Sequence, residues 1–164
     1  GSVAFSVNCE PVEEEKATTT HAEPINQIVA GVDGSPRSLA ALEWAARQAG
    51  LTGSILVVVT TWDWPNTYEG TAPFPPGYDP AVEARKVLDD ALGMVRDAYP
   101  DVAIRQFVAE GHPAPVLVEA SRRANLLVVG SSGHGEFLGM LLGSVSEHCV
   151  THAHCPVVVV RDRG

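Results

Sequence analysis

Short segments that are apolar at every position recur along this chain, and they constrain its fold more than any other feature. Three of them are Ile55–Val59, Leu126–Val129 and Val157–Val160. A strand buried on both faces carries apolar residues throughout, whereas a half-exposed strand alternates. Stretches with helical spacing separate these segments. The sequence therefore predicts an α/β class: a single doubly wound, mainly parallel, five-stranded sheet with helices on both faces.

The boundaries of the elements follow from turn residues and apolar spacing. Ser35 is the predicted N-cap of the first helix, Pro36 opens its first turn, and Gly50 is its predicted stop. The predicted strands are 28–33, 54–61, 101–110, 126–129 and 156–160. The predicted helices are 36–48, 80–99, 113–124 and one that begins near Ser144.

Composition limits the kinds of partner. Residues 1–25 lack a hydrophobic period and are expected to form a mobile N-terminal tail, which leaves residues 26–162 as the domain. The net charge of −9 argues against nucleic acid or an anionic membrane as the main partner. No apolar run reaches the roughly 18 residues of a transmembrane helix. Three cysteines without a disulfide pattern favour a reducing compartment, the cytoplasm.

The position of the strands also predicts where a ligand binds. In doubly wound sheets, ligands lie beyond the carboxyl ends of the strands, where the strand order reverses. Asp33, Thr61 and the segment that begins at Gly130 follow predicted strands. In that segment, glycines permit close approach of backbone amides to an anion, and Gly143-Ser144 lead into a helix whose N-terminus favours negative charge. Phosphate suits this arrangement.

Three familiar signatures are absent from the glycine-rich segment. A Walker A loop would need a lysine and a different glycine spacing, and a dinucleotide fingerprint would need a glycine where Leu138 stands. No G-x-S-x-G nucleophile elbow is present. The segment therefore carries none of these three enzyme signatures.

The glycine spacing instead resembles that of the universal stress protein family. Gly130, two residues, Gly133, nine residues, then Gly143 and Ser144 match the motif of its nucleotide-binding members, and the resemblance extends over residues 26–161. It implies a Rossmann-like fold of the adenine nucleotide alpha hydrolase-like type.

The resemblance also implies a set of site residues. Val32 and Asp33 would lie beside the adenine and ribose, Thr61 would border the adenine, and Gly130, preceded by Val129, would lie under the ribose. The phosphates would be surrounded by Ser132, Gly133, His134, Gly143, Ser144, Val145 and Ser146.

The implied ligand is ATP, and the implied assembly is a homodimer formed through the last strand. No lysine or arginine lies between Gly130 and Ser146, so either Mg²⁺ assists a triphosphate or AMP or cyclic AMP is preferred. A regulatory stress-response module is expected rather than a fast enzyme. The alternatives are a slow ATPase or nucleotidyl-transfer enzyme and a nucleotide-free dimeric scaffold.

Simpler interpretations compete with each of these roles. Asp33 can stabilise a turn together with Ser35, and the glycines can form a flexible connection. His148 and His152, one helical turn apart, suggest a metal site, while Cys149 can pack as a small apolar residue.

Overall fold

A computed structural model describes residues 26–63, 76–132 and 142–161. Five strands alternate with helices, in the order predicted. The strands are β1 (Gln27–Gly31), β2 (Ile55–Trp62), β3 (Ile104–Glu110), β4 (Leu126–Gly130) and β5 (Val157–Val160). The helices are α2 (Pro36–Thr52), α3 (Pro80–Ala98), α4 (Pro113–Ala120), the 3₁₀ turn η2 (Ser121–Arg123) and α5 (Ser144–His152).

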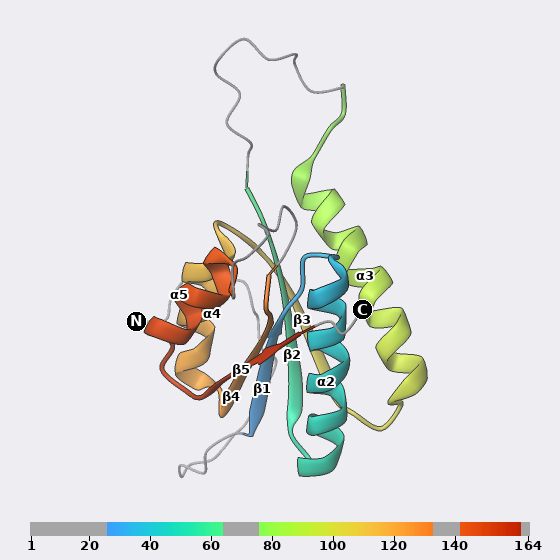
Figure 1. Cartoon of the computed structure of the whole chain (residues 1–164). Helices are drawn as coiled ribbons and strands as arrows, with labels where there is room; N and C mark the ends of the chain where they lie inside the picture. Colours follow the sequence, from blue (N-terminus) through green and yellow to red (C-terminus); the bar gives the residue numbers. More distant parts are fainter. Residues whose placement is uncertain (1–25, 64–75, 133–141, 162–164) are drawn as a thin grey trace, which may run out of the picture.

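The strands form one sheet in the order β3-β2-β1-β4-β5, and every pair is parallel. Helices α2 and α3 cover one face, and α4 and α5 cover the other (Figure 1). The predicted fold class is confirmed. The strand order reverses between β1 and β4, because the chain leaves β1 toward α2 and leaves β4 toward α5 on the opposite face.

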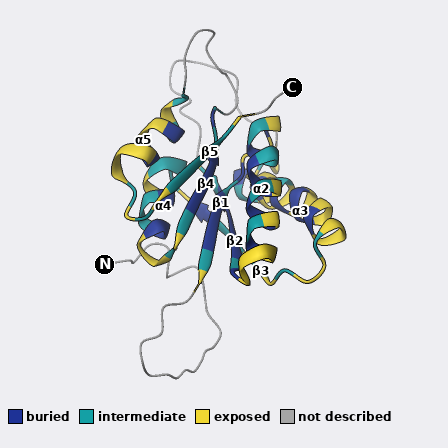
Figure 2. Ribbon diagram, turned by 60° about the horizontal axis from the view of Figure 1, so that its bottom comes forward, coloured by how far each residue is buried: buried dark blue, intermediate teal, exposed yellow. Residues whose placement is uncertain are grey.

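Each face of the sheet has its own apolar core, and Figure 2 shows the central strands as the buried layer between them. Leu56, Leu88 and Leu92 belong to the core under α2 and α3, while Leu117 and Leu127 belong to the core under α4 and α5. This double burial is why β1, β2 and β4 are apolar at successive positions. Within the three described ranges, no helix is both long and apolar enough to cross a membrane.

Two predicted helix ends were wrong. Helix α2 continues through Gly50 to Thr52 and ends at Gly53, whose φ of 72° is the left-handed conformation that glycine favours at a C-cap. Gly50 lies within the helix, where a glycine is tolerated at a cost of about 1 kcal/mol. The third helix ends at Ala120 rather than Ala124, because residues 121–123 tighten into η2.

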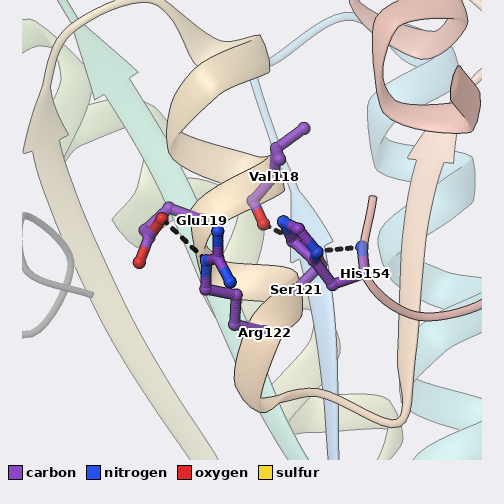
Figure 3. A network of polar contacts seen from close by, with 5 residues as sticks. All are labelled: Val118, Glu119, Ser121, Arg122 and His154. Atoms are coloured by element: carbon purple, nitrogen blue, oxygen red, sulfur yellow. Dashed lines mark hydrogen bonds and ion pairs between the residues drawn. The ribbon is translucent and has the colours of Figure 1, made fainter. Parts of the chain in front are cut away.

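A buried serine joins η2 to the segment that leads into β5. Ser121 is 1% exposed; its Oγ donates to the Val118 carbonyl over 2.6 Å and accepts from the His154 backbone N–H over 2.8 Å (Figure 3). Nearby, Arg122 Nε donates to Glu119 Oε1 over 3.2 Å on a more exposed surface. The Ser121 bonds fix the connection between α5 and β5.

Candidate functional site

The carboxyl ends of β1 and β4 lie side by side at the centre of the sheet. The two strands are paired in register, with Ala30 opposite Val128, so Gly31 and Gly130 end them at the same edge. Val129 is buried below this edge, and Val32 is buried just beyond β1. The predicted site residues that follow these two strands are therefore brought together, although about 100 positions separate them in the sequence.

Asp33 forms a tight turn between β1 and α2. Its Oδ1 accepts from the Ser35 backbone N–H over 2.9 Å, and its own backbone N–H donates to Ser38 Oγ over 3.2 Å. Ser35 in turn caps α2, as predicted, by accepting from the Ser38 N–H. The hydrogen bond from Ser35 confirms the simpler interpretation, in which Asp33 stabilises this turn. It is compatible with ligand binding, since a carboxylate offers about four lone-pair sites.

One backbone carbonyl group joins the turn after β4 to the start of α5 by two hydrogen bonds, and this contact is called the closure. The Ser131 carbonyl accepts from the Gly143 N–H over 2.7 Å and from Ser146 Oγ over 2.9 Å. The Ser146 hydroxyl also lies 3.2 Å from the Gly143 carbonyl. Because Ser146 is buried and its hydroxyl is bonded within the protein, its side chain stabilises the closure.

The two glycines of the motif that the structure describes both lie in close contact with neighbouring residues, Gly130 more tightly than Gly143. A Cβ atom at Gly130 would stand 2.8 Å from the carbonyl carbon and oxygen of Arg37, and one at Gly143 would stand 3.1 Å from the Cα of Ser132. Gly143 has an ordinary φ of −76°. The absence of a side chain, and not an unusual backbone conformation, is what makes glycine fit at Gly143. Glycine also fits at Gly130 because a side chain there would meet the Arg37 backbone.

Helix α5 begins at this closure. Gly143 occupies the N-cap, and no side chain in the described part of the chain caps the helix. Ser144 is exposed and Val145 is half-buried. Backbone N–H groups at an uncapped helix N-terminus, together with the helix dipole, favour an anion.

A basic side chain that the sequence analysis missed reaches this place. Arg37, in the first turn of α2, donates from Nη1 to Ser132 Oγ over 2.6 Å. The segment from Gly130 to Ser146 has no lysine or arginine of its own, and Arg37 lies 95 positions before Ser132 in the sequence. The available signal was its place in the first helical turn after β1, at the predicted ligand edge.

Thr61 lies near the end of β2, on the other side of β1. It is half-buried and paired with Ala109 of β3. Next to it, Trp62 lines an open groove of about 590 Å³ together with Val82, Arg85 and Asp89 of α3. Beyond the strand, Asp63 Oδ2 lies 3.4 Å from His112 Nδ1, which joins β2 to the start of α4.

Two of the predicted site residues, Gly133 and His134, lie outside the described residues. The remaining ten fall into two groups. Those at the ends of β1, β4 and the start of α5 meet at one edge: Val32, Asp33, Val129, Gly130, Ser132, Gly143, Ser144, Val145 and Ser146. Thr61 is one strand further from β4.

The histidines and cysteines near the C-terminal end do not assemble into a larger metal site. The rings of His148 and His152 lie 4.4 Å apart on α5, but no group of three or more His, Cys, Asp or Glu side chains in the described ranges could hold a metal ion. Cys149 is fully buried, and burial raises the pKa of its thiol to about 11. It packs as an apolar residue in the core under α4 and α5.

Comparison with known proteins now identifies the family. A family model described as "Universal stress protein family" matches residues 24–161. The chain belongs to this family. The resemblance inferred from the glycine spacing is thereby confirmed. Universal stress protein Rv1996 of Mycobacterium tuberculosis is 37% identical over 158 residues, which is 92% of this universal stress protein and 47% of the relative.

A second relative has a similar identity and is likewise covered over about half of its length. A universal stress protein of Mycolicibacterium smegmatis is 38% identical over 141 residues, which is 83% of this chain and 46% of the relative. This universal stress protein therefore spans about half the length of the curated relatives it matches.

Solved structures confirm the Rossmann-like fold. The universal stress protein UspA from Lactobacillus plantarum has a TM-score of 0.66 at 20% identity, covering 85% of this chain and all of that one (100%). A universal stress protein crystallised in complex with cAMP has a TM-score of 0.64 at 27% identity, covering 85% of this chain and 99% of that one.

Proposed function

We propose that this universal stress protein binds an adenine nucleotide at the edge formed by β1, β4 and the start of α5, and acts as a dimeric stress-response module in the cytoplasm. ATP is the first candidate, with AMP and cyclic AMP as alternatives and with Mg²⁺ as an optional partner. Residues 26–162 form the proposed nucleotide-binding domain. Slow ATP hydrolysis is not required for this role.

One observation carries the proposal. At a single edge, the N-terminus of α5, the Ser131–Ser132 turn and the Arg37 guanidinium are linked by hydrogen bonds, and Asp33 follows β1 at the same edge. The first three suit an anion, because they offer N–H groups, hydroxyls and a positive charge. A carboxylate next to them suits a sugar hydroxyl. A nucleotide combines both kinds of group.

The related structure that contains cAMP supports the choice of base. That protein is 27% identical and superimposes over 85% of this chain. An adenine nucleotide bound in the same fold makes an adenine nucleotide the first ligand class to test here.

The proposed dimer uses β5. This strand is at the edge of the sheet, pairs with β4 alone in the described part of the chain, and consists of four half-buried valines, Val157–Val160. An apolar edge strand invites pairing with another chain. Sedimentation equilibrium of the purified protein is expected to give a dimer, and a monomer at all concentrations would remove this part of the proposal.

Asp33 offers a direct test of nucleotide binding. Asp33→Asn keeps the oxygen that accepts from Ser35 and removes the charge, so the turn survives. Isothermal titration calorimetry with ATP, AMP and cyclic AMP is expected to show saturable binding by the native protein and about tenfold weaker binding by the variant, since bonds to charged groups contribute roughly 1.5–3 kcal/mol.

Two results would contradict the proposal in different ways. If the native protein binds no adenine nucleotide, with Mg²⁺ or without it, the proposed function is wrong. If the native protein binds but Asp33→Asn binds equally well, Asp33 serves the turn alone. GTP is the control ligand for recognition of the base.

A further inference from the structure

Arg37 brings a positive charge to the candidate phosphate site from a distant part of the chain. Its Nη1 atom donates to Ser132 Oγ over 2.6 Å, and its side chain is half-buried. Ser132 is joined to the start of α5, since the preceding Ser131 carbonyl accepts from the Gly143 N–H. The guanidinium is therefore bonded to the turn that is itself joined to the start of α5.

The backbone holds Arg37 in this position. Because Gly130 has no side chain, the Arg37 backbone packs directly on the end of β4; a Cβ at Gly130 would stand 2.8 Å from the Arg37 carbonyl and 3.0 Å from the Arg37 Cβ. Arg37 also follows Ser35 and Pro36, which fix the start of α2. The base of the side chain is thus anchored on the strand that leads to the site.

The position of this charge matters because the protein is acidic. The net charge of −9 disfavours a ligand that itself carries several negative charges. A guanidinium presents five N–H donors in a planar fork that matches phosphate, and such bonds are among the stronger hydrogen bonds in proteins. A serine hydroxyl and a phosphate oxygen are both acceptors for the same donor.

We propose that Arg37 is a specificity-determining residue that binds the phosphate groups of the nucleotide and sets the preference for nucleotides with more phosphates. Its guanidinium turns from Ser132 Oγ to a phosphate oxygen when the ligand enters. The inference rests on the proposed nucleotide site, and it adds the residue that binds the phosphate groups there.

A purely structural role makes a different prediction. If the bond from Arg37 to Ser132 only holds the turn after β4, its loss would weaken binding of every ligand of the site, including adenosine, which has no phosphate. If Arg37 binds phosphate, its loss would weaken ATP and leave adenosine unchanged. The ratio of the two affinities therefore separates the roles.

The test is calorimetry of ATP and adenosine binding to the native protein, Arg37→Met and Arg37→Lys. Methionine keeps the unbranched apolar stem and removes the charge. We expect Arg37→Met to weaken ATP binding about 10- to 100-fold and adenosine binding less than about twofold. Arg37→Lys is expected to recover part of the ATP affinity as a point charge.

Arg47→Met is the matched control. Arg47 is exposed on the same helix, roughly 15 Å further along its axis, and its removal changes the net charge equally. At physiological salt this distance exceeds the Debye length of about 8 Å, so ATP affinity should be unchanged. Equal losses for ATP and adenosine in Arg37→Met, or an equal loss of ATP binding in Arg47→Met, would overturn the inference and leave the nucleotide site standing. If the native protein binds neither ligand, the site and the inference fall together.

Discussion

Gly143→Asp is expected to weaken ATP binding more than 100-fold while the protein stays folded. Gly143 is the N-cap of α5 and has extended backbone angles, with φ −76° and ψ 174°. Aspartate is among the preferred N-cap residues, because its carboxylate accepts from the N–H groups of the first helical turn. The variant would thus place its own anion where the phosphate is proposed to bind.

Gly143→Asn is the matched control for this prediction. Both side chains add a Cβ about 3.1 Å from the Ser132 Cα, so both disturb the turn to the same extent. Asparagine caps a helix about as well as aspartate does but carries no charge. Calorimetry should therefore find at least tenfold weaker ATP binding to the aspartate variant than to the asparagine variant. Equal affinities would mean that the start of α5 does not bind phosphate.

Gly130→Ala is expected to destabilise the protein by about 1–3 kcal/mol. The added methyl group would meet the carbonyl carbon and oxygen of Arg37 at 2.8 Å. These are backbone atoms at the start of α2, and they cannot rotate away as the end of a side chain can. Strand β4 and helix α2 must therefore move apart, which loosens the core beneath them.

Gly93→Ala is expected to have the opposite effect on the free energy of unfolding. Gly93 lies in the interior of α3, and a Cβ built there would have no described atom within 4 Å apart from its chain neighbours and the nearby backbone of its own helix. Alanine should stabilise this helix by roughly 0.5–1 kcal/mol. Urea unfolding of both variants measures the two free energies. A stabilising or neutral Gly130→Ala would show that β4 and α2 are not held in close contact.

Local pattern predicts where these helices begin better than where they end. Pro36 and Pro80 open the helices that the sequence assigned to them, because proline is tolerated at the first helical turn and disfavoured in the interior. The end of α2 was missed: Gly50 and Gly53 are both glycines, and local pattern does not show which one adopts the left-handed conformation.

Local pattern predicts the place of the candidate site in the fold but not all the contacts that form it. The glycine spacing between Gly130 and Gly143 is a local pattern, and the alternation of strands and helices places it at the ligand edge. The reason for glycine at Gly130 was not visible, since the atoms that exclude a side chain belong to Arg37, 93 positions earlier.

The sequence by itself determined the order and type of the elements, the doubly buried sheet and the motif that identifies the family, because periodicity, turn residues and motif spacing are properties of neighbouring residues. Only the tertiary structure decided which side chains face the site from other elements. Arg37 meets Ser132 because β1 and β4 are adjacent in the sheet, and the closure of Ser131 on Gly143 and Ser146 exists only once α5 packs beside β4. Contacts of this kind depend on the relative placement of whole elements, which no local pattern encodes.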